Sequence, residues 1–100
     1  MFMSVLRDLE LRHLVALDAV ATEGTFARAA ERLGYTQSAV SQQIAALERA
    51  VGEKVFDRPG GPRAVELTPF GAELLRGGRD LLARVAALAD DLDRFRAGHA

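Results

Sequence analysis

The side chains of this sequence that are best suited to chemistry are neutral hydrogen-bonding groups at the start of the stretch TQSAVSQQIAALERAVG, from Thr36 to Gly52. At helical spacing these groups fall on one side: Gln37, Ser38, Ser41 and Gln42. Hydroxyl and amide groups donate as well as accept hydrogen bonds, so they can distinguish base edges in a DNA groove. Serine and glutamine also occur on helix faces that contact only water, so the neighbouring elements have to decide between the two interpretations.

The opposite side of the same stretch is apolar. Val40, Ile44, Leu47 and Val51 recur at steps of four, three and four residues, which predicts a helix with one buried face. Such a helix packs its apolar side against a core and directs its polar side away from that core.

Composition limits the classes of protein that this chain can belong to. One hundred residues with 49% hydrophobic and 27% charged side chains are typical of one ordinary domain. The absence of cysteine excludes disulfides and thiolate sites, and no apolar run is long enough for a membrane span or a signal peptide. We therefore expect a cytoplasmic protein. The two histidines, His13 and His99, lie far apart, so we expect no metal site, no cofactor and no catalytic constellation.

The distribution of charge favours the middle of the chain as a contact for an anionic partner. The formal net charge is -1, which by itself argues against nucleic acid. Residues 24–63, however, carry six basic against four acidic side chains, whereas the flanking segments are net acidic.

Two further helices are expected before the polar one. Residues before Leu9 form a short tail, and apolar spacing predicts a structural helix from about Leu11 to Thr22. Gly24 ends it, and Thr25 caps a second helix whose buried side is formed by Phe26, Ala29, Ala30 and Leu33. Gly34 ends that helix, and Thr36 caps the next. Two helices joined by a short turn with glycine form a helix-turn-helix, although an αα-hairpin used only for packing has the same pattern.

A small hairpin is expected after the third helix. KVFDR, residues 54–58, predicts a strand with Val55 and Phe56 on opposite faces, PGGP a loop, and RAVEL, residues 63–67, a returning strand. This hairpin is a wing, and Arg58 and Arg63 flank its tip, where they can reach phosphates. Incidental solvated arginines are the alternative.

A long helix follows. Thr68 and Pro69 form a strong start signal, and nothing stops the helix before about Arg96. An apolar stripe at alternating steps of four and three predicts pairing with a second copy through Leu74, Leu81, Val85, Leu88, Leu92 and Phe95. Gly77 and Gly78 interrupt this helix, and a close contact with the first helix is one explanation for them.

Together these segments resemble a known family. The ordered set LRHLVALDAVATEGTFARAAERLGYTQSAVSQQIAALERAVGEKVFDR followed by RAVELTPFG is similar to the amino-terminal DNA-binding domain of LysR-type transcriptional regulators, from about Leu9 to Arg94. The resemblance implies a mainly α fold with a small β-hairpin: a winged helix-turn-helix over residues 1–67 and a long linker helix over residues 68–100 that pairs two subunits. It also implies an effector-binding domain that this sequence does not contain, so a fragment or a short relative is expected.

The resemblance also assigns roles at matching positions. It places Gln37, Ser38, Ser41 and Gln42 in the groove, and Thr25, Arg28, Thr36, Arg58 and Arg63 at the DNA backbone. Thr25 and Thr36 are also expected to act as helix N-caps. The alternative for Arg28 is an ordinary solvated arginine on a helix. Two departures stand out: glutamine at position 42, where relatives often have arginine, favours adenine over guanine, and the wing tip lacks basic residues.

Two functional hypotheses follow. The favoured one is a dimeric, sequence-specific regulator of transcription that binds double-stranded DNA. The alternative is a protein-interaction module that uses the long helix, with the winged domain as a scaffold or docking site and no specific DNA binding, which the weak net charge favours.

Overall fold

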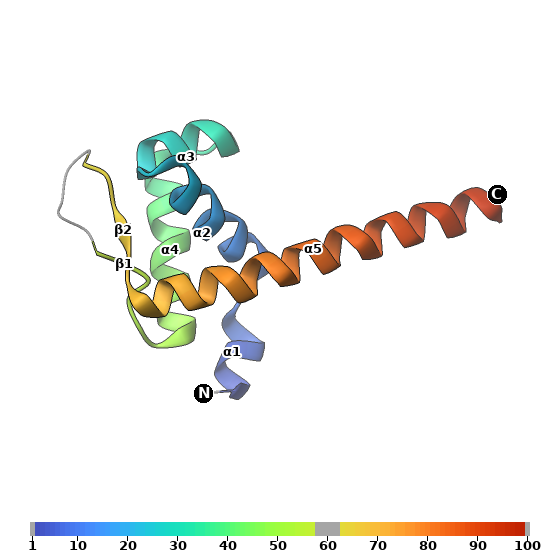
Figure 1. Ribbon diagram of the computed structural model, residues 1–100, viewed down its shortest axis with the longest axis horizontal. Helices are drawn as coiled ribbons and strands as arrows, with labels where there is room; N and C mark the ends of the chain where they lie inside the picture. Colours follow the sequence, from blue (N-terminus) through green and yellow to red (C-terminus); the bar gives the residue numbers. More distant parts are fainter. Residues whose placement is uncertain (1, 58–62, 100) are drawn as a thin grey trace.

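The computed structural model describes residues 2–57 and 63–99. A compact set of helices and a two-stranded hairpin occupy one end of the molecule, and a single long helix projects from them (Figure 1). The overall dimensions of 52 × 32 × 19 Å reflect that projection.

The core is built by three helices, α2 (Leu11–Glu23), α3 (Phe26–Leu33) and α4 (Gln37–Val51). Their apolar sides meet as the sequence predicts, and the largest fully buried side chains include Leu17, Val20, Ile44 and Leu47. Small residues at Ala29 and Ala30, both buried, let α3 approach the other two helices closely.

The turn between α3 and α4 requires a glycine. Gly34 has a φ of 72°, the left-handed conformation in which a side chain is strained. Its N–H and that of Tyr35 donate to the last carbonyls of α3, which ends the helix and redirects the chain into α4.

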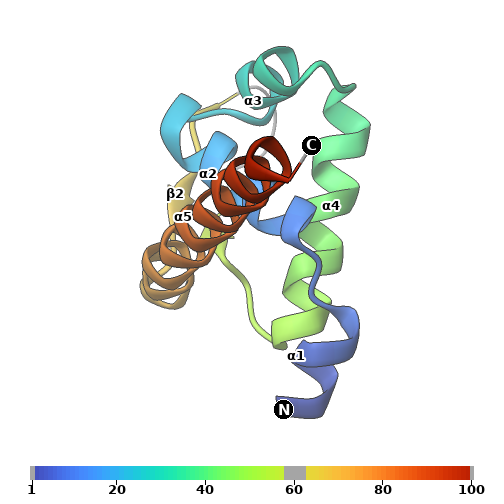
Figure 2. The same cartoon turned by 90° about the vertical axis from the view of Figure 1, so that its right-hand side faces the viewer.

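The amino-terminal residues form a helix where the sequence predicted a tail. α1 (Phe2–Asp8) lies beside the carboxy-terminal end of α4 (Figure 2). It is only seven residues long, too short to be stable alone, and the partly buried Val5 and Leu9 attach it to the rest of the chain. That stabilisation comes from tertiary packing, which the local sequence does not reveal.

The hairpin is confirmed, but its strands are shorter than predicted. β1 (Phe56–Asp57) pairs antiparallel with β2 (Glu66–Leu67), with Phe56 opposite Leu67. Val55 precedes the paired residues, and its carbonyl accepts the N–H of Thr68. The side chains of Val55 and Phe56 are both buried, and their placement on opposite faces stays a prediction. The PGGP loop lies outside the described residues.

The last helix, α5 (Pro69–Gly98), is capped by Thr68, whose Oγ1 accepts the N–H of Gly71 at 2.9 Å and donates to the Lys54 carbonyl at 2.8 Å. Its first half packs against α2, where Arg79 donates to Asp18 at 2.8 Å, and Leu82 is the last of its side chains to pack against the core. Beyond Leu82 the described part of α5 is exposed.

Candidate nucleic-acid interface

The polar side of α4 does not pack against the core. Gln37, Ser38 and Gln42 are exposed and Ser41 is half-buried, whereas Ile44 and Leu47 on the apolar side are completely buried. The structure therefore brings the four candidate groove residues together on one accessible helix face. In Figure 2, α4 runs along one side of the molecule, away from the axis of α5.

Hydroxyl caps fix the starts of the two helices that form the turn. Thr25 Oγ1 accepts the N–H of Arg28, and Thr36 Oγ1 accepts the N–H of Ala39, each at 3.0 Å. Both threonines therefore act as helix caps, which is one of the two roles predicted for them. Each cap also places a partly positive helix end near the molecular surface, where a phosphate is favoured.

The wing is attached to the same region by its backbone. The Val65 N–H donates to the carbonyl of Gly24 at 3.0 Å, so the returning strand is held against the turn that precedes α3. Arg63, just before that strand, is exposed. Arg58 lies outside the described residues, so its position relative to α4 stays a prediction.

Two basic residues that sequence reasoning did not single out lie beside the polar face. Arg12 from α2 and Arg49 from the end of α4 line a shallow hollow of about 340 Å³ together with Gln42 and Gln43. Arg12 is remote from Gln42 in the sequence, so only the packing of α2 against α4 reveals the proximity. Arg49 is one of the six basic residues of the middle of the chain, and packing brings Arg12, which is also ion-paired with Glu10, beside it.

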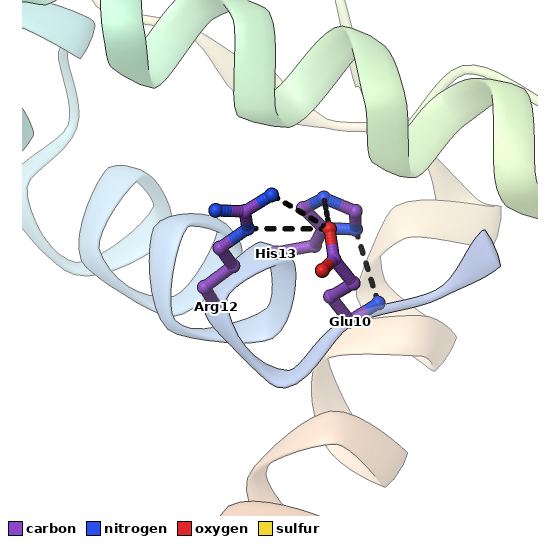
Figure 3. A network of polar contacts seen from close by, with 3 residues as sticks. All are labelled: Glu10, Arg12 and His13. Atoms are coloured by element: carbon purple, nitrogen blue, oxygen red, sulfur yellow. Dashed lines mark hydrogen bonds and ion pairs between the residues drawn. The ribbon is translucent and has the colours of Figure 1, made fainter.

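His13 has a structural role at the start of α2. The Glu10 N–H donates to His13 Nδ1 at 3.2 Å, and Nε2 lies 3.3 Å from Glu10 Oε2, which also accepts from Arg12 (Figure 3). Because Nδ1 accepts, the neutral ring carries its proton on Nε2. Burial lowers the pKa of His13 from 6.5; Glu10 opposes this shift, while Arg12 and Arg49 reinforce it.

Comparison with known proteins identifies this architecture. The family model for the bacterial regulatory helix-turn-helix protein, lysR family, matches residues 11–72. The chain belongs to the lysR family. That match begins at Leu11, after α1, and ends just inside α5.

Relatives within the lysR family are close over nearly the whole chain. HTH-type transcriptional regulator IlvR of Caulobacter vibrioides is 44% identical over 90 residues, which covers 90% of this chain and 30% of that protein. HTH-type transcriptional regulator ArgP of Vibrio vulnificus is 42% identical over 87 residues, or 87% of this chain and 27% of that one. The chain thus spans about three tenths of the length of such relatives.

Solved structures of the family agree with the fold. The DNA-binding domain of BenM in complex with catB site 1 DNA superposes with a TM-score of 0.83 at 34% identity, covering 92% of this chain and 97% of that one. The CbnR DNA-binding domain bound to DNA gives 0.77 at 35% identity, covering 89% and 99%. The winged helix-turn-helix fold with a long helix, predicted from the sequence, is confirmed.

Proposed function

We propose that this chain is the sequence-specific DNA-binding domain of a transcriptional regulator and that it binds double-stranded DNA as a homodimer through α5. The observation that carries the proposal is the exposed row of neutral hydrogen-bonding side chains on α4, the second helix of the helix-turn-helix. In the major groove, the amide of Gln37 or Gln42 is suited to adenine, and the Ser41 hydroxyl accepts or donates as the base requires. Two lysR-family domains of the same fold were solved as DNA complexes, which supports this role.

Affinity would come from the groups around α4. In this proposal Thr25, Arg28, Thr36 and Arg63 contact phosphates, together with Arg58, while Ser38 lies in the groove beside Gln37. Such contacts position the protein on the duplex without reading its sequence. Residues 1–67 would form the DNA-binding part and residues 68–100 the pairing part. A bacterial regulator of this kind acts in the cytoplasm, where the chromosome lies.

Catalysis has no part in the proposal. The relatives are transcriptional regulators, and in the described ranges no three His, Cys, Asp or Glu side chains gather as a metal site would require. Nor does any helix within those ranges have the length and apolar character needed to cross a membrane.

Selection of bound duplexes from a random pool tests the proposal directly. The purified chain is incubated with random DNA at several salt concentrations, and bound sequences are recovered and sequenced. We expect an inverted repeat, because a two-fold dimer presents α4 twice. Recovery of unselected random sequence, with equal affinity for every duplex, would leave the protein-interaction module as the better explanation.

A further inference from the structure

Arg79 joins α5 to α2 near the point where α5 leaves the core (Figure 1). Its Nε donates to Asp18 Oδ1 at 2.8 Å, and its Nη2 donates to Thr22 Oγ1 at 3.3 Å. The two acceptors are four residues apart on α2, so one planar guanidinium spans a turn of that helix. The other ion pairs of α5 within the described residues are internal to this helix: Arg76 with Glu73 and Asp80, Arg94 with Asp91, and Arg96 with Asp93.

The residues just before Arg79 bring the two helices close together. A Cβ at Gly78 would meet Leu14 Cδ2 at 3.1 Å, so the close contact with the first long helix, anticipated for the glycine pair, applies to this residue. A Cβ at Gly77 would meet nothing within 4 Å. Helices that pack ridge into groove have their crossing angle set by side chains, and glycine supplies none. The hydrogen bonds of Arg79 therefore add a directional contact where Gly78 gives none.

The free half of α5 converts a small change in the angle between α2 and α5 into a large displacement. Leu82 is the last side chain of α5 that packs against the core, and the helix continues to Gly98. At about 1.5 Å per residue Phe95 lies about 24 Å beyond Arg79, so a tilt of about 10° at Arg79 displaces it by about 4 Å. Base pairs follow one another at about 3.4 Å along a duplex, so this displacement corresponds to about one base-pair step.

We propose that Arg79 is a positioning residue: through Asp18 and Thr22 it fixes the angle between α2 and α5, and thereby the spacing of the two half-sites that a dimer recognises. This inference rests on the proposed dimerisation through α5. Because α2 packs against both α4 and α5, it transmits the direction of α5 to α4. In a two-fold dimer the same angle occurs in both subunits, so a change in the angle displaces both α4 helices.

The role assigned to Arg79 is geometric, and its contribution to stability is small. The side chains of Arg79 and Asp18 are 53% and 29% exposed. Ion pairs at such exposure are screened by water and contribute little to the free energy of unfolding. Replacing Arg79 should therefore leave the core folded and each α4 face unchanged, while the angle of α5 becomes less well defined.

Distances between two spin labels test the angle without DNA. The chain has no cysteine, so labels can be attached at Ala27→Cys in α3 and Asp90→Cys in the free half of α5, both exposed positions. Dilution with excess unlabelled chain restricts the measurement to distances within one copy. We expect Arg79→Gln to widen the distance distribution by about 3 Å or more, as the lever of α5 implies. Arg76→Gln is the matched control and should leave the distribution unchanged, since Arg76 pairs only within α5.

Selection from random duplexes tests the consequence for DNA. The wild type and Arg76→Gln should recover inverted repeats with one predominant spacing. Arg79→Gln should recover repeats whose spacings spread over at least two further base pairs, while its affinity for an isolated half-site stays within twofold of the wild type. Asp18→Ala should reproduce both results, because it removes the main acceptor of Arg79 and leaves the arginine in place.

Three outcomes would overturn this inference. The first is a distance distribution or a half-site spacing of Arg79→Gln that equals that of the wild type. The second is a large fall in melting temperature of both Arg79→Gln and Asp18→Ala, which would make the link a requirement for folding. The third is a wild-type chain that recovers no repeat, and this result would overturn the proposed function as well.

Discussion

At the scale of single residues, the chemistry of the α4 face determines how this domain would read DNA. Gln42 is an uncharged amide, so the face presents amides and hydroxyls without a positive charge of its own. Specificity would then depend on neutral hydrogen bonds, and affinity on cations such as Arg12, Arg49 and Arg63 around it. The two contributions can be separated by mutation.

We expect Ser41→Ala and Gln37→Ala to reduce the preference for selected DNA over random DNA. Each loses a base contact that is worth roughly 1–3 kcal/mol when well made, about fivefold to a hundredfold in discrimination. Fluorescence anisotropy with the selected and a scrambled duplex measures both affinities. Arg63→Ala is the contrasting variant: it should weaken both complexes alike and reduce the salt slope by about 1. Equal discrimination in wild type and Ser41→Ala would remove Ser41 from the proposed base contacts.

A second residue-scale prediction concerns His13, whose neutral ring accepts from the Glu10 N–H. Because burial lowers its pKa in the folded chain, the unfolded chain takes up a proton first as the pH falls through 6.5. His13 therefore contributes stability that is fully present above about pH 7 and is lost as the pH falls through the folded-state pKa. His13→Gln should flatten this part of the stability profile, measured by urea unfolding between about pH 5 and 8.

His99→Gln provides the control for that experiment, since it removes an exposed histidine at the end of α5 that stacks on Phe95 and whose Nδ1 lies at hydrogen-bond distance from the Phe95 carbonyl. Its pH profile should match that of the wild type. A profile for His13→Gln that also matches the wild type would show that His13 does not couple stability to pH.

At the scale of elements, the junction between the hairpin and α5 is a close backbone contact. A Cβ at Gly71 would lie 2.0 Å from the Val55 carbonyl oxygen, far inside contact distance and against backbone. The Thr68 N–H donates to that same carbonyl at 3.0 Å. The start of α5 and the first strand of the wing are therefore fixed together.

We expect Gly71→Ala to lower the free energy of unfolding by about 2–4 kcal/mol, because the backbone has to move to relieve the clash. Urea unfolding at a low protein concentration, where α5 is unpaired, measures this change. Gly77→Ala in the same helix is the matched control, and it should be neutral or stabilise by up to about 1 kcal/mol. Similar melting curves for the two variants would show that the Val55 contact is relaxed in solution.

Sequence patterns predicted the elements with strong local signals and missed those without them. The helix caps at Thr25, Thr36 and Thr68 could be predicted, because a hydroxyl side chain just before an apolar helical repeat commonly serves as an N-cap. α1 could not be predicted from the sequence, because a seven-residue segment has too few helical turns to show a hydrophobic periodicity. Its stability depends on contact with α4. The predicted starts of the two strands were also wrong, because pairing begins only at Phe56 and Glu66.

At the scale of the whole molecule, α5 divides into a half that belongs to the core and a half that is free. Leu75 and Gly78 are buried, whereas Val85 and the residues that follow are exposed. A free helix with an apolar stripe requires a partner to remove that stripe from water. Two copies joined in this way would present two α4 helices to one duplex.

Ending the chain after Leu82 should therefore abolish dimerisation and leave the folded core intact. DNA affinity should fall by a factor of about 100 or more, because each monomer then binds its half-site independently. In the dimer, binding of one subunit raises the effective concentration of the other subunit at the second half-site. Sedimentation, circular dichroism and anisotropy measure the three quantities. Leu88→Asp in the full chain is a matched variant that should reproduce the loss of pairing. Undiminished DNA affinity of a truncated monomer would contradict a role for the dimer in binding.

The sequence alone determined the order of the elements from α2 to α5, the polar face of α4 and the long apolar stripe, because local spacing and helix caps indicate each of them. Only the tertiary structure decided what lies beside these features: Arg12 and Arg49 next to Gln42, the burial of His13 against Glu10, and the different surroundings of Gly77 and Gly78. Arg12 and Gln42 are remote in the chain, as are Leu14 and Gly78. These proximities result from the packing of α2 against α4 and α5, which no local pattern specifies.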